Sequence, residues 1–175
     1  MTRRTAVTWL LWSSLAFLVC FVAVEPEDVR DLGAAALGLH AGVGVLFALV
    51  VAVWFGRYLA RGLAGRPGPK LTGLARQTHP WRHRALYSGL VAMLAAGGLI
   101  GIAAPYVVAA FGVLPLGPGP DLRSLHGAAQ GIHEVVFSLL IAGVVLHAVF
   151  HLWRHTALRD DALRIMVPRT LHRWL

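Results

Sequence analysis

Charged residues are scarce in this sequence, and acidic residues are the scarcest among them. Only 14% of the 175 residues are charged, and 8 of them are Asp or Glu. In soluble domains roughly a quarter of all residues are charged, so this composition excludes an ordinary soluble enzyme domain. A hydrophobic content of 57% equally excludes a disordered chain. The single cysteine, Cys20, excludes an internal disulfide.

Long apolar stretches are abundant instead, and they predict an integral membrane protein. A spanning helix needs about 20 mainly apolar residues. Four stretches satisfy this requirement, at residues 6–24, 32–56, 85–104 and 131–153. The first is too long for the apolar region of a signal peptide, and no small-residue cleavage site follows it, so we interpret it as a helix. We therefore expect an all-α, four-helix membrane bundle that forms a single domain over residues 1–175.

Basic residues are distributed unevenly, and this distribution predicts the orientation. All but two of the 16 lysines and arginines lie at the N-terminus, between the second and third spans, or in the C-terminal tail. The exceptions are Arg30 and Arg123, in the two acidic loops. The positive-inside rule then places both termini in the cytoplasm. The net charge of +8 comes from short basic segments between long apolar stretches. We therefore expect membrane lipid rather than nucleic acid as the partner.

Three histidines of the apolar stretches are the strongest functional candidates. They are His40 in the second span and His133 and His147 in the fourth. Ionisable residues within a span are costly and point to function by default. His133 and His147 are fourteen residues apart, close to four helical turns, so they share one face about 21 Å apart. This spacing predicts two cofactors stacked across the bilayer, although a lone intramembrane histidine can also simply hydrogen-bond a neighbouring helix.

Imidazole binds haem iron, zinc and copper. Only Glu134 among acidic residues and cysteines accompanies these positions, which disfavours a hard cation or a tetrahedral zinc site. A histidine on each of two facing helices favours a b-type haem with two axial histidines. Depth pairs His40 with His133. For His147, the candidate at the same depth is His83, at the start of the third span.

The remaining histidines near the basic side are expected to be interfacial or solvated, and they are His79, His151, His155 and His172. His147, His151 and His155 form an i, i+4, i+8 row that could imitate a metal-binding stripe. Gly38 and Gly42 are interpreted as helix-packing positions.

Several short motifs occur in a characteristic order. They are Leu39-His40 with Gly44, His83–Tyr87, Phe111–Pro115, His133-Glu134, Leu146-His147 and Arg159–Pro168. In this order the sequence resembles the bacterial cytochrome b-561 family, four-helix di-haem proteins related to the cytochrome b subunits of hydrogenases and formate dehydrogenases. The similarity extends over nearly the whole chain.

This resemblance implies that His40 and His133 are the axial ligands of an outer haem b and that His147 is one ligand of an inner haem. The chain also departs from the family pattern at one ligand position. The family carries its fourth ligand early in the first span, where this chain has Thr8. Three alternatives are open: His83 is the partner of His147, the inner haem is five-coordinate, or it is absent.

The function implied by the resemblance is electron transfer across a bacterial inner membrane to or from ubiquinone or menaquinone. Some similar proteins oxidise superoxide, which leaves the question of an enzymatic activity open. A homodimer or a redox partner subunit is also implied. The alternative is a non-redox or single-haem subunit that anchors a larger complex, for which Thr8 is the main argument.

Overall fold

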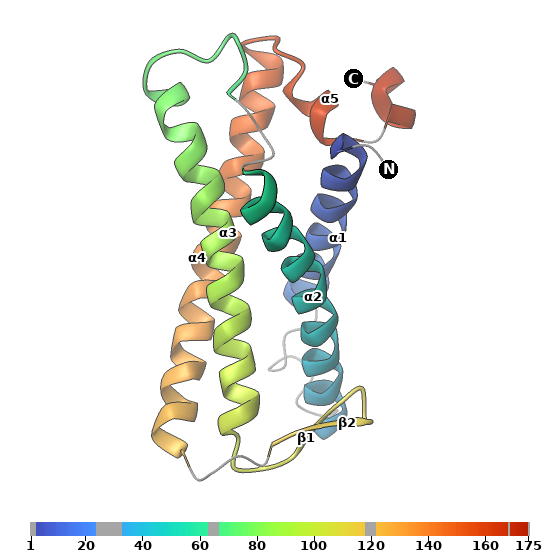
Figure 1. Cartoon of the computed structure of the whole chain (residues 1–175), viewed down its shortest axis with the longest axis vertical. Coiled ribbons are helices and arrows are strands. Elements are labelled where there is room, and N and C mark those ends of the chain that lie inside the picture. Colours follow the sequence, from blue (N-terminus) through green and yellow to red (C-terminus); the bar gives the residue numbers. More distant parts are fainter. Residues whose placement is uncertain (1–2, 24–32, 63–66, 118–121, 168, 175) are drawn as a thin grey trace.

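The computed structural model describes residues 3–23, 33–62, 67–117, 122–167 and 169–174, and Figure 1 shows their arrangement. Within them lie a two-stranded hairpin, a 3-10 helix and five α-helices: α1 (Arg3–Ala23), α2 (Ala34–Arg61), α3 (Gly73–Ala103), β1 (Val108–Ala110), β2 (Leu114–Leu116), α4 (Arg123–Thr156), α5 (Ala162–Met166) and η2 (Arg169–Trp174). Residues 24–32, which contain the first predicted acidic loop, lie outside the described residues, as do residues 118–121 of the second. The all-α expectation is confirmed.

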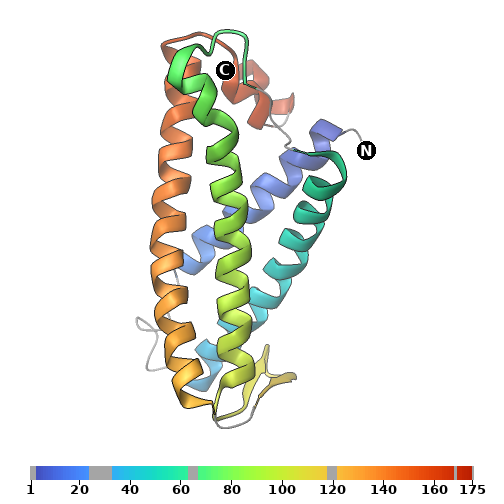
Figure 2. The same cartoon turned by 60° about the vertical axis from the view of Figure 1, so that its left-hand side comes forward.

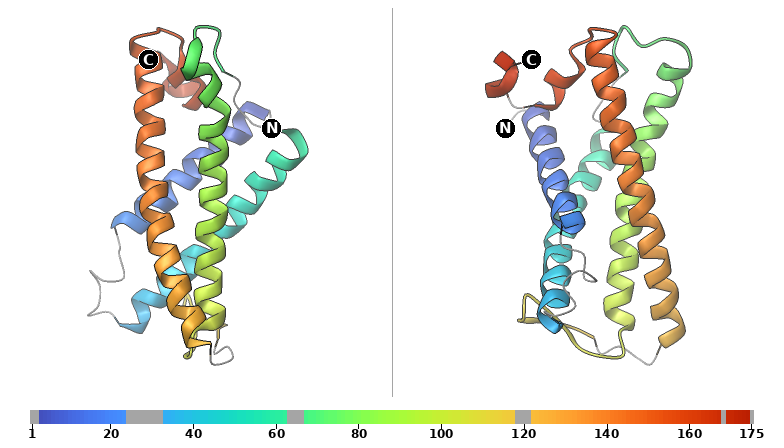
Figure 3. Two further views of the ribbon diagram at one scale, coloured as in Figure 1. Left: turned by 90° about the vertical axis from the view of Figure 1, so that its left-hand side faces the viewer. Right: turned by 180° about the vertical axis from the view of Figure 1, so that it is seen from behind.

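The first four helices run alternately in opposite directions, so both termini lie at one end and the hairpin lies at the other (Figure 1). Helices α3 and α4 are side by side along their length. Helices α1 and α2 are inclined to this pair, and α2 diverges from α3 toward the end that carries the termini (Figure 2 and Figure 3). Residues 67–72, which lead into α3, lie at that same end (Figure 1).

Three of the described helices are long and apolar enough to cross a membrane: α2 with 28 residues, α3 with 31 and α4 with 34. Helix α1 contains a shorter apolar stretch, Thr8–Val22. The chain is therefore a multi-pass membrane helical bundle. That α1 is a fourth span stays a prediction.

Helix α3 begins at Gly73, well before the expected start of the third span at Ala85, and it contains Pro80. Proline is tolerated in membrane helices because neighbouring groups satisfy the backbone that it leaves unpaired. The polar first turns are also held by side-chain contacts, since the Arg82 Nη2 donates to the Ala75 carbonyl at 2.9 Å and its guanidinium lies 3.4 Å from the Phe150 ring centre. The early turns thus pack on α4 instead of forming a loop.

A buried apolar cluster joins all four long helices near the middle of the bundle. Its members are Leu18, Phe21, Phe47, Val51, Leu90, Met93 and Leu140. On α4, Leu140 lies midway between His133 and His147 in the sequence, so this cluster separates the two levels at which the histidines gather.

The hairpin packs on the first turns of α2. Its strands are antiparallel, with Ala109 opposite Pro115. A Cβ atom on Gly38 would lie 2.6 Å from the Ala109 carbonyl oxygen, and one on Gly42 would lie 2.5 Å from the Phe111 ring. The packing role expected for both glycines is confirmed, but their partner is the hairpin rather than another helix.

Candidate functional site

His40 of α2 and His133 of α4 face each other near the hairpin end of the bundle. Their ring centres are 6.4 Å apart and their planes are inclined by 73°. Phe21 of α1 presents its ring to His40, with the ring centres 4.9 Å apart. The structure therefore brings together the two histidines that were paired from their depth in the sequence.

The orientation of His133 is set by α3. Its Nδ1 lies 3.0 Å from the Met93 carbonyl oxygen. Because a carbonyl only accepts, Nδ1 carries the proton and Nε2 keeps its lone pair for a metal, the arrangement common to metal-ligating histidines. Gly97 leaves the room for this ring, since a Cβ atom there would lie 3.2 Å from Cε1 of His133.

The His40–His133 pair fits the axial ligation of a haem. Each metal–nitrogen bond is about 2 Å long, and each ring centre lies about 1 Å behind its nitrogen because ring bonds are about 1.3 Å long. Two imidazoles on opposite sides of one iron therefore have ring centres about 6 Å apart, close to the observed 6.4 Å. Nδ1 of His40 is buried with no hydrogen-bond partner among the described residues.

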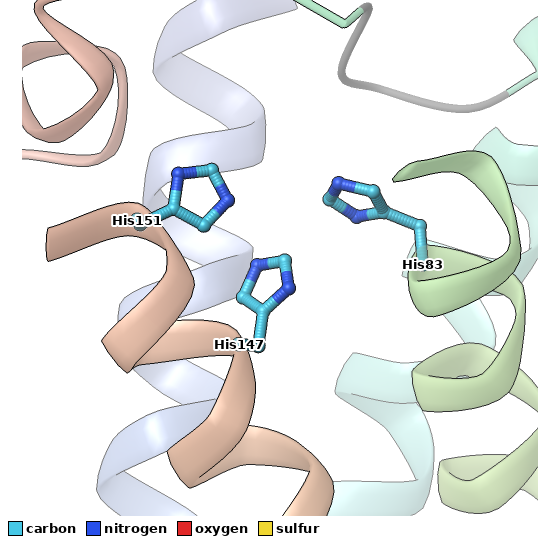
Figure 4. A group of neighbouring side chains, drawn as sticks. All are labelled: His83, His147 and His151. Atoms are coloured by element: carbon cyan, nitrogen blue, oxygen red, sulfur yellow. The ribbon is translucent and has the colours of Figure 1, made fainter. Parts of the chain in front are cut away.

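A second group of histidines lies toward the end that carries the termini. His83 extends from α3, and His147 and His151 extend from α4, so that the three rings converge between the two helices (Figure 4). One nitrogen from each ring lies within 4.8 Å of the others. The ring centres of His83 and His147 are 4.9 Å apart, and those of His147 and His151 are 4.5 Å apart. His83 is thus beside His147, as depth predicted.

Sequence reasoning was wrong about two histidines that it placed in solvent or at the interface. His79 is only 2% exposed and His151 only 6%. The i, i+4 spacing of His147 and His151 was the signal that could have identified the second, but proximity to Arg154 outweighed it. His155 and His172 are half-buried.

Two arginines accompany the second group. Arg154 is buried and forms an ion pair with Asp160, with Nη2 and Oδ2 2.6 Å apart. Arg82 places its guanidinium over the Phe150 ring, 3.4 Å from the ring centre. Each guanidinium therefore already has a partner, Asp160 for Arg154 and the Phe150 ring for Arg82.

An open groove lies between α2 and α3 where the two helices diverge. It has a volume of about 420 Å³. It is lined by Phe55, Tyr58, Arg84, Tyr87, Ser88, Val91 and Ala92. Tyr58 and Tyr87 stack with their ring centres 5.0 Å apart, so the groove offers a flat aromatic wall beside a basic side chain.

A multi-pass helical bundle with facing histidines inside it belongs to the class of membrane proteins that hold haem between their helices. The chain belongs to the family described as prokaryotic cytochrome b561, whose model matches residues 5–169. Membership implies haem b binding and electron transfer in a membrane. No curated protein sequence matches the chain.

Proposed function

We propose that this protein holds one haem b between His40 and His133 and exchanges its electron with a quinone in the membrane. The 6.4 Å separation of the two rings is the observation that supports this most directly. Bound there, the haem supplies one-electron chemistry by cycling between ferric and ferrous iron.

The surrounding residues would hold the ligands and exclude water. The Met93 carbonyl orients His133 through Nδ1. Phe21, which packs against His40, belongs to the buried apolar cluster together with Phe47. Burial in an apolar environment and hydrogen bonds to the ligands are two of the means by which a protein tunes the potential of such a centre.

The groove between α2 and α3 is the candidate quinone site. Ala92 lines it, and the next residue, Met93, orients His133, so the groove and the haem position share one turn of α3. The stacked Tyr58 and Tyr87 suit a flat ring, and the Arg84 guanidinium supplies donors for a quinone carbonyl. The groove suits ubiquinone and menaquinone equally.

The location in a bacterial inner membrane, with both termini in the cytoplasm, also belongs to this proposal. Its support is the uneven distribution of Lys and Arg, and the fold, which gathers the termini and residues 67–72 at one end. A homodimer or a redox partner subunit would supply or accept the second electron of the quinone.

Superoxide oxidation is not part of the proposed function, because Arg30 and Arg123 alone provide little positive charge on the opposite side to attract an anion.

The test is the haem content of the purified full-length chain, measured by a pyridine haemochrome assay. We expect His40→Ala and His133→Ala to lose the haem because each removes one axial ligand. His126→Ala is the matched control: its Nδ1 also faces a carbonyl of α3, Ile100, at 3.1 Å, but its neighbouring ring belongs to Tyr106. This variant should keep the haem.

Unchanged haem in either ligand variant would refute the site, and a haem-free wild-type chain would favour a membrane anchor without redox activity.

The quinone proposal is tested by mixing the oxidised protein with short-chain ubiquinol and menaquinol. Reduction of the haem by one of them supports the proposal, and reduction by neither contradicts it.

A further inference from the structure

We infer that His83, His147 and His151 form a three-histidine site for a divalent transition-metal ion such as Zn²⁺, at the level where the family resemblance places a second haem. The three rings converge from α3 and α4 (Figure 4). This site is separate from the haem position at His40 and His133, and it does not depend on electron transfer there.

Ring separations distinguish the two kinds of centre. With a metal–nitrogen bond of about 2 Å and a further 1 Å or so to the ring centre, each ring centre lies about 3 Å from the metal. Histidines on opposite sides of an iron then have ring centres about 6 Å apart, whereas at a tetrahedral angle of about 109° they are about 5 Å apart. The observed 4.9 Å and 4.5 Å agree with the tetrahedral arrangement.

A haem with two axial histidines does not fit between His83 and His147 in this arrangement. Their ring centres would have to separate by more than 1 Å, toward the 6.4 Å of the His40–His133 pair. The first-span ligand of the family is also missing, because the side chain of Thr8 has no nitrogen with which to bind iron. The three histidines therefore differ from the second haem site that the family resemblance implies.

The buried nitrogens of this group lack partners. Nδ1 of His147 and both ring nitrogens of His151 are buried without a hydrogen-bond partner among the described residues. Buried polar atoms are nearly always paired, and an exception calls for an explanation such as an ion. A metal bound to one nitrogen of each ring would satisfy part of this group.

The donor set selects the class of metal. It consists of three imidazoles, with no carboxylate or thiolate within the group. The sequence disfavoured a tetrahedral zinc site because it showed no such ligand near His147, but the buried His151 supplies a third imidazole instead. Imidazole suits zinc, copper and nickel, whereas magnesium and calcium require oxygen ligands. His147 and His151 are four residues apart on one helix, the spacing that places two ligands on the same face of a zinc-binding helix.

The nearby positive charges do not prevent metal binding. The Arg154 charge is offset by Asp160 at 2.6 Å. The Arg82 guanidinium lies 3.4 Å from the Phe150 ring centre, against the negative face of an aromatic system. Imidazole binds metals in its neutral form.

The test uses the full-length, haem-containing protein in detergent. After treatment with a chelator, the protein is dialysed against Zn²⁺, and zinc and haem are counted per chain by mass spectrometry of the elements and by the haemochrome assay. We expect one zinc and one haem. X-ray absorption at the zinc edge should report nitrogen or oxygen ligands at about 2.0 Å.

Three variants locate the metal. His83→Ala and His151→Ala should each weaken zinc binding at least tenfold, because each removes one ligand. His155→Ala, one turn further along α4 and outside the group of three, should bind zinc like the wild type. An unchanged haem count in all three variants shows that the fold is intact.

Other results would overturn the inference. They are the absence of bound zinc, zinc retained in both ligand variants, zinc lost equally in the His155→Ala control, or a second haem that disappears in His147→Ala. None of these results bears on the haem at His40 and His133, so the two proposals can fail independently.

Discussion

At the scale of single residues, the partner of each ring nitrogen distinguishes one histidine from another. His126 and His133 lie two turns apart on α4, and each places Nδ1 near a carbonyl of α3, those of Ile100 and Met93. The ring of His133 faces another histidine, whereas that of His126 faces Tyr106. The same local contact thus serves a candidate ligand in one case and packing in the other.

The close approach of Gly97 to His133 gives a prediction at this scale. In Gly97→Ala, the new methyl group would lie 3.2 Å from Cε1 and 3.4 Å from Nδ1 of His133. The His133 ring must shift, which lengthens the hydrogen bond from its Nδ1 to the Met93 carbonyl. Because contacts that orient a ligand are worth about tenfold or more in metal affinity, we expect haem retention to fall about tenfold. Transfer of haem to apomyoglobin measures this loss.

Gly98→Ala is the matched control, since a Cβ atom at the adjacent position meets nothing within 4 Å. This variant should release haem at the wild-type rate. Equal rates for the two variants would show that Gly97 does not position His133.

At the scale of elements, the Arg154–Asp160 ion pair connects the end of α4 to the start of α5. Arg154 and Asp160 are both almost completely buried, with side-chain exposures of 3% and 1%. The second oxygen of Asp160 accepts a hydrogen bond from the Ala162 backbone N–H at 3.0 Å, at the start of α5. The pair therefore holds the C-terminal segment against the end of the bundle that contains His83, His147 and His151.

Two neighbouring aspartates allow this junction to be tested. Asp160→Asn leaves the buried Arg154 without its countercharge, and we expect the free energy of unfolding to fall by about 3–5 kcal/mol. Asp161→Asn affects an exposed pair with Arg164 at 3.7 Å, and should cost less than about 1 kcal/mol. Asparagine also tolerates the positive φ of 54° at Asp161. Chemical unfolding in detergent measures both values, and similar losses would contradict a special role for Asp160.

At the scale of the whole molecule, the alternating helices separate two ends of different chemistry. One end carries the termini, residues 67–72 and most of the basic residues. The other carries the hairpin, on which Val113 is 81% exposed and Phe111 46%. An exposed apolar hairpin beside apolar helices favours contact of this segment with the membrane surface.

This arrangement predicts opposite labelling at the two ends. In a Cys20→Ala background, Thr72→Cys and Val113→Cys place single thiols at the start of α3 and in the hairpin, both at exposed positions. A membrane-impermeant maleimide added to intact spheroplasts should label Val113→Cys alone, because the positive-inside rule puts Thr72 in the cytoplasm. Both variants should react after lysis. Labelling of Thr72→Cys in intact spheroplasts would reverse the proposed orientation.

Much of the fold could be predicted from local sequence patterns. A membrane helix needs only a long apolar stretch, so the regions of α2 and α4 could be recognised without knowledge of their neighbours. The helical period placed His133 and His147 on one face of α4, and depth alone paired His40 with His133. The early start of α3 could not be predicted, because the turns around Pro80 depend on contacts between Arg82 and Phe150, which come from different helices.

The sequence by itself determined the class of this protein: apolar length, helical period and charge asymmetry are properties of short segments, and they define a histidine-bearing membrane bundle. Only the tertiary structure decided which histidines gather. His151 was expected to be interfacial or solvated from its neighbours in the chain, yet it is 6% exposed because α3 packs on α4 and brings His83 opposite it. Burial and ligand geometry are determined by residues that are distant in sequence, so local patterns could not reveal the group of three.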